Sequence, residues 1–157
     1  MPSPRIRPLD LTDGATAAAV HRVGLAAYAV EAELIGFDGI PALAEGLEEM
    51  RGRALDWLGA VEPDGGIAGF LAWEETAADG PVGIDRLCVD PARFRRGVAS
   101  LLLRHALEEL FQGRVVEVAT GADNAPAVAL YERLGFVRGA DFSPVPGLRM
   151  ASFTHGA

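Results

Sequence analysis

The sequence predicts one mixed α/β domain in which helices cover a twisted sheet. Three observations lead to this fold class. Short apolar runs suited to strands alternate with segments of helical spacing, glycine and proline mark the breaks between them, and 50% of the 157 residues are hydrophobic. A chain of this length is expected to form a single domain, residues 1–157, with a substantial core. The predicted element order is β-α-α-β-β-β-α-β-α-β-β, a mixed α/β arrangement.

The first half of the chain is predicted to hold an edge strand, two helices and a hairpin. Pro8 cannot donate to a sheet ladder, so the first strand belongs at an edge. Thr12 or Asp13 can cap the first helix, and Pro41 suits the first turn of the second. A turn over residues 62–66 separates the two strands of the hairpin. We expect these elements at residues 5–9, 15–34, 41–51, 56–61 and 67–73.

The second half is predicted to alternate strands and helices. Asn124 is a good N-cap for the later helix, with Pro126 in its first turn, and Gly135 is a typical residue for its end. The proline-rich segment 143–147 is expected to be a loop. We expect strands over 84–90, 114–120, 136–138 and 148–153, and helices from residue 98 and over 124–134.

The stretch from residue 84 to residue 103 has the properties of an anion site. A strand ends at Pro91, a basic loop follows, and a helix begins at Val98. Gly97 and Ala99 are too small to keep an anion away from the first-turn amides, which the helix dipole makes attractive to phosphate. Three cations precede that helix, and they are Arg93, Arg95 and Arg96.

This loop resembles the pyrophosphate loop of the GCN5-related N-acetyltransferases, in which [Arg/Gln]-x-x-Gly-x-[Gly/Ala] opens a helix after a strand. Gly97 and Ala99 match the two small positions, while Phe94 stands where the family usually has Arg or Gln. The resemblance implies that the loop binds acetyl-CoA. The residues it assigns to this role are Phe94, Arg95, Arg96, Gly97, Val98, Ala99 and Ser100.

A second stretch is similar to the other signature of that family, Asn-x-x-Ala-x-x-x-Tyr-x-x-x-Gly-Phe. Asn124, Ala127, Tyr131, Gly135 and Phe136 occupy its fixed positions. The resemblance implies that Asn124 contacts the pantetheine or diphosphate of the cofactor. It also implies that Ala127 lets the cofactor pass closely and that Tyr131 faces the thiol. With both signatures, the resemblance covers nearly the whole chain, and it implies that the chain has the fold of that family.

The chemistry implied by the resemblance is direct transfer of the acetyl group of acetyl-CoA to a primary amine of a small molecule or peptide. Tyr131 is then the candidate acid that protonates the leaving thiolate. Backbone groups at Leu87, Cys88 and Val89 are expected to bind the pantetheine arm. Alternation along the strand puts Leu87 and Val89 on one face and Cys88 on the other. Cys88 is expected to be a buried packing residue rather than a nucleophile.

The base that takes the proton of the amine is left open among carboxylates. Asp85 is favoured, because alternation puts it on the strand face of Leu87 and Val89. The alternatives are Glu31, Glu74 and Glu75. Tyr28 and Glu31 lie three residues apart on one helix face, so both are expected to project into a cleft and contact the acceptor.

Several classes are disfavoured by composition. A net charge of −8 argues against nucleic-acid binding, no apolar run is long enough for a membrane helix, and the three histidines show no metal-ligand spacing. A single cysteine and an N-terminus without an apolar signal core fit a cytoplasmic protein. In the family the acceptor is shaped by segments equivalent to residues 28–47 and 141–148, and the acids of residues 28–40 favour a cationic amine.

Two rival functions remain open at this stage. One is a non-catalytic CoA-binding module that senses the cofactor or regulates a partner. The other is a transferase for a longer acyl group. A homodimer is also left open.

Overall fold

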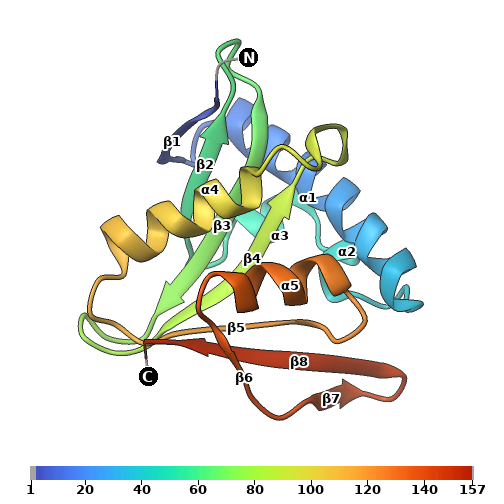
Figure 1. Ribbon diagram of the computed structural model, residues 1–157. Coiled ribbons are helices and arrows are strands. Elements are labelled where there is room, and N and C mark those ends of the chain that lie inside the picture. Colours follow the sequence, from blue (N-terminus) through green and yellow to red (C-terminus); the bar gives the residue numbers. More distant parts are fainter. Residues whose placement is uncertain (1–2, 157) are drawn as a thin grey trace.

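The structure is a computed structural model that describes residues 3–156. It contains one eight-stranded sheet with helices on both faces (Figure 1). The strands are β1 (Arg5–Pro8), β2 (Asp56–Val61), β3 (Ile67–Glu75), β4 (Val82–Val89), β5 (Val116–Gly121), β6 (Val137–Arg138), β7 (Phe142–Val145) and β8 (Leu148–His155). The helices are α1 (Gly14–Ile35), α2 (Pro41–Ala44), α3 (Leu47–Arg51), α4 (Val98–His105) and α5 (Ala125–Arg133), with a 3-10 turn η1 (Pro91–Arg93) and a π-helical turn η2 (Ala106–Leu110).

The sheet divides between β4 and β5. Its order is β1-β2-β3-β4-β5-β8-β6, and β7 also pairs with β8. All described pairs are antiparallel except β4 with β5, whose parallel pairing covers only Val82 with Val116 and Gly83 with Glu117. Beyond those pairs the two strands separate (Figure 1). Within residues 3–156, β4 therefore has no strand partner on its β5 side from residue 84 onward.

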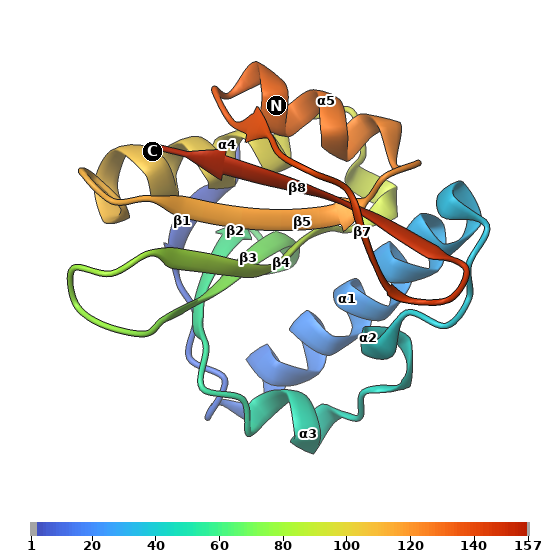
Figure 2. The same cartoon turned by 90° about the horizontal axis from the view of Figure 1, so that it is seen from below.

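Two hydrophobic clusters lie on the two faces of the sheet. Figure 2 shows α1, α2 and α3 on one face and α4 and α5 on the other. On the first face, Val20 and Val23 of α1 pack with Phe70 and Cys88. The second cluster holds the buried side chains of α4 and α5 together with strand residues, including Leu102, Leu103, Tyr131, Phe136 and Phe153. Cys88 and the pair Leu87 and Val89 contact different clusters, as strand alternation predicted.

A β-bulge interrupts β4 at Asp85. Ala72 pairs with Arg86 and the next residue, Trp73, pairs with Ile84, so Asp85 has no partner on β3. A bulge shifts the alternation by one residue. The regular alternation behind the expectation that Asp85 shares a strand face with Leu87 is therefore interrupted here. Asp85 accepts a hydrogen bond from the side chain of its neighbour Arg86, and both Asp85 and Leu87 line the pocket described below.

The single helix predicted over residues 41–51 is wrong, because the structure has two short helices there. Glu45 has an extended backbone (φ −74°, ψ 125°) and ends α2, and Gly46 is the N-cap of α3. The Glu49 carboxylate accepts the backbone N–H of Gly46 at 3.2 Å and stabilises this new start. The break turns the buried side chain of Glu45 toward the sheet.

The predicted loop over residues 143–147 is also corrected. Residues 142–145 form β7, which pairs with β8 through Phe142 with Met150 and Val145 with Leu148. The register is irregular between these two pairs. That irregularity accommodates Pro144 in an edge strand, where a missing N–H is tolerated. The tight turn to β8 is made by Gly147 with φ +87°.

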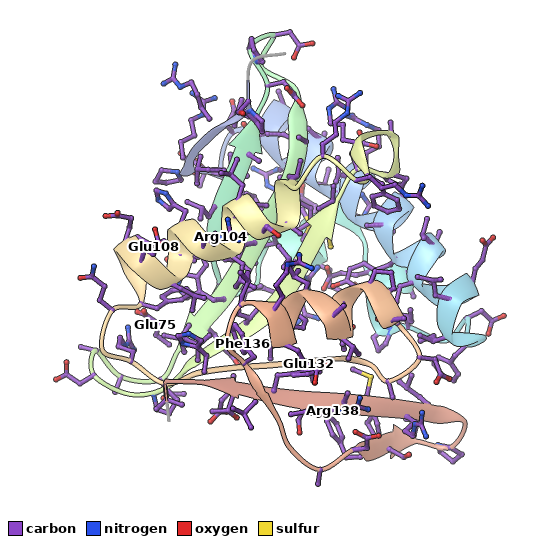
Figure 3. All side chains as sticks on the ribbon, in the orientation of Figure 1. Glu75, Arg104, Glu108, Glu132, Phe136 and Arg138 are labelled. Atoms are coloured by element: carbon purple, nitrogen blue, oxygen red, sulfur yellow. The ribbon has the colours of Figure 1, made fainter. Side chains whose placement is uncertain are left out.

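Two charged side chains near α4 face outward, while an aromatic one below α5 is buried. Figure 3 shows Arg104 and Glu108 on the outer side of α4 and its continuation, and both are exposed. Phe136 is buried below α5. None of the helices within residues 3–156 is long and apolar enough to cross a membrane.

Candidate active site

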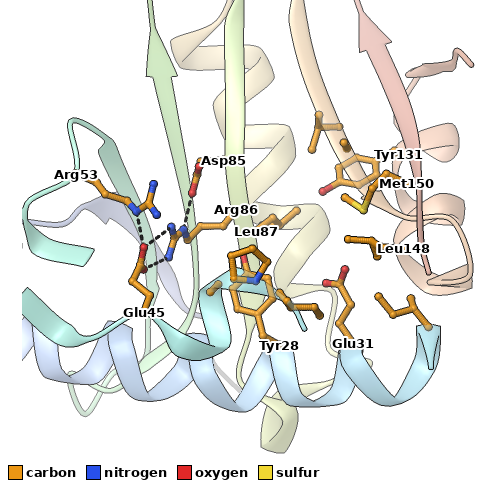
Figure 4. A pocket seen from close by; sticks show the side chains of 16 residues that line it. Tyr28, Glu31, Glu45, Arg53, Asp85, Arg86, Leu87, Tyr131, Leu148 and Met150 are labelled. Carbon is orange, nitrogen blue, oxygen red and sulfur yellow. Dashed lines mark hydrogen bonds and ion pairs between the residues drawn. The ribbon is translucent and has the colours of Figure 1, made fainter. Parts of the chain in front are cut away.

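A pocket of about 250 Å³ opens near the place where β4 and β5 separate. Its walls come from α1, the segment from α2 to β2, the bulge of β4, β5, α5 and β8. Figure 4 shows the side chains that point into it, with Tyr131 and Glu31 on one side and Arg53 and Glu45 on the other. The pocket thus joins the late helix α5 to the region expected to shape the acceptor.

Tyr131 enters the pocket from α5. Its ring packs against Phe136 and Phe153, with both pairs of ring centroids 5.4 Å apart. Burial raises the pKa of the Tyr131 phenol, and the negative charge of the Glu31 carboxylate raises it further. The hydroxyl therefore keeps its proton at neutral pH, as a proton donor must.

Glu31 and Tyr28 enter from α1, and both line the pocket, as their spacing predicted. In Figure 4 the Glu31 carboxylate points toward Tyr131 and Leu148. Burial raises the pKa of this carboxyl, and the nearby backbone amide of Gly121 opposes the shift. Desolvation likewise raises the pKa of the Tyr28 phenol. The pocket therefore holds one carboxyl that gives and takes a proton more readily near neutrality than an exposed glutamate does.

An ionic network forms the opposite wall. Arg86 Nη1 donates to Glu45 Oε1 at 2.8 Å, and Arg86 Nε donates to Asp85 Oδ2 at 2.6 Å. Arg53 Nε also donates to Glu45 Oε2. The side chains of Arg86 and Glu45 are only 6% and 4% exposed, and the Arg86 guanidinium lies 5.8 Å from the Trp57 ring centroid. One buried carboxylate thus links two arginines.

Two of the four carboxylates considered as bases reach this pocket. Glu31 and Asp85 line it, whereas Glu74 and Glu75 do not. Glu75 instead accepts a hydrogen bond from Arg114 at 2.5 Å. Asp85 also lines the pocket, but its Oδ2 already accepts a hydrogen bond from Arg86 Nε at 2.6 Å.

Cys88 is 3% exposed and lies under α1. Burial raises the pKa of its thiol to about 12. A thiol that stays protonated is a poor nucleophile, so its environment agrees with the packing role expected from the sequence.

The loop before α4 has the shape of an anion site. Gly97 adopts φ +73° as the N-cap of α4, with nothing within 4 Å of the position a Cβ would take. Arg95 also has a positive φ, 66°. The first-turn amides of α4 are therefore open to a ligand, because no side chain at Gly97 covers them.

The three arginines of this loop differ in their contacts. Arg93 Nε donates to Glu62 at 2.9 Å and its Nη1 to Asp90 at 3.0 Å, which ties the loop to the β2–β3 turn. Arg95 and Arg96 form no hydrogen bond or ion pair through their side chains within the described part of the chain. Those two side chains are the ones available to an incoming anion.

Asn124 and Ser100 are engaged by the protein itself. Asn124 Oδ1 accepts the backbone N–H of Ala127 at 3.3 Å and caps α5. Ser100 Oγ, in the first turn of α4, accepts a hydrogen bond from Arg133 of α5 at 3.1 Å. Arg133 therefore brings a further cation beside the anion loop.

Four residues of this region were not expected from the sequence, and they are Glu45, Arg53, Arg86 and Arg133. A charged residue inside the apolar run of β4 could have singled out Arg86, and the Glu45-Gly46 pair could have marked the helix break. Arg86 and Glu45 are 41 residues apart, and no sequence pattern predicts that their side chains bind each other. No group of metal-ligating side chains that could hold an ion occurs among residues 3–156.

The divided sheet, the open loop before α4 and the pocket at the division define an acyltransferase-type fold, and comparison with known proteins identifies the family. The sequence profile described as "Acetyltransferase (GNAT) family" matches residues 21–136. The chain belongs to this family, and the predicted mixed α/β fold is confirmed.

One curated relative is the UPF0157 protein YqkA of Bacillus subtilis, 33% identical over 131 residues. The alignment covers 83% of this chain and 37% of that protein. Across four curated relatives, the aligned regions span 25–42% of their own lengths.

Solved structures show the same fold at low sequence identity. The ribosomal-protein-S18-alanine N-acetyltransferase of Escherichia coli superimposes with a TM-score of 0.73 at 22% identity, covering 96% of this chain and 92% of that one. The PaiA N-acetyltransferase of Thermoplasma acidophilum, solved in complex with coenzyme A, gives 0.72 at 16% identity, covering 97% and 98%.

Proposed function

We propose that this protein transfers the acetyl group of acetyl-CoA directly to a primary amine of a small molecule or peptide. The observation that carries the proposal is the meeting of Tyr131 and Glu31 in one pocket at the division of the sheet. One group holds a proton and the other can accept one. The GNAT relatives named as N-acetyltransferases support the reaction class.

The residues present fit coenzyme A. The open space at Gly97 leaves the first-turn amides of α4 free for a diphosphate, and Phe94, Arg95, Arg96, Val98, Ala99 and Ser100 complete this loop. Among the described residues, no strand pairs with the backbone of Leu87, Cys88 and Val89 toward β5, so this backbone can pair with the amides of a pantetheine arm. Asn124 and Ala127 would flank that arm. The bound cofactor would supply an acetyl thioester with a good leaving group.

Tyr131 is the proposed acid. During transfer the C–N bond forms and the C–S bond breaks, and the departing sulfur takes the proton from Tyr131 Oη. Burial keeps that proton in place until it is needed. Return of the proton from solvent would complete the cycle.

Glu31 is the proposed base, with Asp85 as the second candidate. The attacking amine must lose a proton, and a carboxylate whose pKa is raised by burial is better matched to that task. Asp85 Oδ2 already accepts a hydrogen bond from Arg86, so this oxygen is engaged before an amine arrives. Tyr28, beside Glu31 on the same face of α1, is proposed to contact the acceptor.

The experiment that tests this function is a CoA-release screen. Acetyl-, propionyl- and succinyl-CoA are each combined with a panel of amines, and CoA binding is measured separately by calorimetry. We expect turnover with acetyl-CoA and weaker turnover with the longer chains. Tight CoA binding without turnover of any pair would replace the enzyme with a non-catalytic CoA-binding module. Faster turnover of the longer chains would replace acetyl transfer with transfer of a longer acyl group.

A further inference from the structure

The pocket is bipolar. Figure 4 places Glu31 and Tyr131, the proposed proton-transfer pair, at one side and Arg53 at the other, with Arg86 and Leu87 between them. The acceptor amine has to reach the first side for transfer to occur. Any further group of a small acceptor therefore extends toward the arginines.

Each nitrogen of the Arg86 guanidinium already faces a carboxylate oxygen. Its Nε binds Asp85 and its Nη1 binds Glu45, while Nη2 lies 3.5 Å from the other Glu45 oxygen. It is also only 6% exposed. Arg86 holds the wall together and is unsuited to ligand contact.

Arg53 differs in both respects. Its side chain is 45% exposed, it lines the pocket, and only its Nε is engaged, by Glu45. Neither terminal nitrogen forms a hydrogen bond or ion pair with any residue between 3 and 156. A guanidinium with two free terminal nitrogens is a planar fork that matches a carboxylate.

Charge also limits what can occupy that side. In the described part of the chain, Glu45 is the only carboxylate bound to Arg53, and it is also bound to Arg86. A second ammonium on the acceptor would meet Arg53 with the same charge and be disfavoured.

We propose that the acceptor is a small amine that also carries a carboxylate, which the two terminal nitrogens of Arg53 bind while the amine faces Glu31. The inference rests on the proposed acetyl transfer and names its substrate class. The pocket volume of about 250 Å³ suits a small molecule, being below the range common for drug-sized ligands.

The test compares amines that differ only in the carboxylate. CoA release is measured with ω-amino acids from β-alanine to 6-aminohexanoate, each against the alkylamine of the same chain without its carboxylate, and with lysine against cadaverine. We expect the best amino acid to exceed its matched amine in kcat/KM by roughly tenfold to a hundredfold, the range of a charge-assisted hydrogen-bond pair. The chain length of the optimum reports the span from amine to carboxylate.

Variants assign the effect to Arg53. In Arg53→Gln the ratio between amino acid and matched amine should fall toward one, and Arg53→Lys should restore part of it. Gln can still donate to Glu45, which also keeps its bond to Arg86, so the wall is preserved. Arg22→Gln, which changes an exposed arginine of α1, serves as the matched control and should keep the wild-type ratio.

Two results would overturn the proposal and leave acetyl transfer intact. One is equal turnover of the matched pairs by the wild type, and the other is an unchanged ratio in Arg53→Gln. If no amine is turned over, the proposed function itself fails. Recognition of the carboxylate is then tested by binding alone. Calorimetry with 6-aminohexanoate and pentylamine on the CoA-saturated protein then shows whether the carboxylate is recognised, and equal affinities would reject it.

Discussion

Arg86 Nη1 donates to Glu45 Oε1 across 2.8 Å and joins the bulged strand β4 to the break between α2 and α3. Both side chains are almost fully buried. Charges removed from water in this way are costly alone and tolerable only together. The wall of the pocket therefore depends on the pair as a unit.

Glu45→Gln should reduce the free energy of unfolding by about 3 kcal/mol, because it leaves the buried Arg86 charge short of one partner. Urea denaturation measures this loss. The matched control is Glu48→Gln, which breaks the exposed pair with Arg51 and should change stability by less than about 1 kcal/mol. A double variant, Glu45→Met with Arg86→Met, should be less destabilised than the sum of the two single changes; simple additivity would show that the two residues do not act together.

Tyr131→Phe should lower kcat by roughly a hundredfold, because it removes the proposed proton donor. The ring remains to pack against Phe136 and Phe153, so the affinity for CoA should stay near the wild-type value. Stopped-flow CoA release and calorimetry measure the two quantities. Tyr28→Phe provides the comparison, since loss of that hydroxyl should act on the KM of the amine. Unchanged kcat in Tyr131→Phe would remove Tyr131 as the acid.

The pH profile identifies the base. With burial raising the pKa of Glu31 above its ordinary 4.5, kcat/KM should rise with pH as this carboxyl loses its proton. Glu31→Gln should lower kcat/KM and abolish this rise, whereas Asp85→Asn should retain it. If the rise of kcat/KM with pH is instead lost only in Asp85→Asn, the general base is Asp85.

The same carboxyl links folding to pH. A group whose pKa is raised in the folded state binds more protons there than in the unfolded chain. Its contribution to stability is fully present below pH 4.5 and is lost as pH rises through the raised value. As pH rises through this range, the Glu31→Gln variant should therefore lose less stability than the wild type. Thermal unfolding measured as a function of pH gives both losses. A parallel pH dependence of the two proteins would contradict the assignment.

We expect the three arginines of the anion loop to contribute differently to the affinity for CoA and to its salt dependence. Arg95→Gln and Arg96→Gln should each weaken it severalfold and reduce its dependence on salt, because their free charges attract the phosphates. Arg93→Gln should leave the salt dependence unchanged and instead resemble Glu62→Gln, its partner across 2.9 Å. Isothermal titration at two salt concentrations distinguishes these outcomes. Equal salt effects in all three arginine variants would mean that Arg93 also faces the ligand.

Local signals in the sequence were enough to predict most of the sheet and the loop before α4. Pro91 ends a strand, Gly97 opens a helix and Asn124 caps another. Each of these residues determines the backbone conformation of only the few residues next to it. The bulge at Asp85, the helix break at Glu45 and the strand over Phe142–Val145 were missed. Each depends on a contact with another element: β3 for the bulge, Arg86, 41 residues away, for Glu45, and β8 for β7.

The site divided in the same way. Motifs predicted roles for Tyr131, Asn124 and Gly97, and helical spacing predicted that Tyr28 and Glu31 share a cleft. Of these residues, Tyr131, Tyr28 and Glu31 line the pocket. No local sequence pattern indicates Arg53, because it lines the pocket only once the α3–β2 segment has folded against the rest of the site. Its role could be inferred only once the contacts of Arg86 and Glu45 had accounted for the neighbouring charges.

The burial of Cys88 has a practical consequence at the bench. It is the only cysteine of the chain, and its shielded, protonated thiol should react slowly with disulfide reagents such as Ellman's reagent. In an assay that detects free thiols, the folded protein should then contribute almost no background. The colour that develops would count released CoA alone, while a burst of protein thiol would report unfolding in the same cuvette.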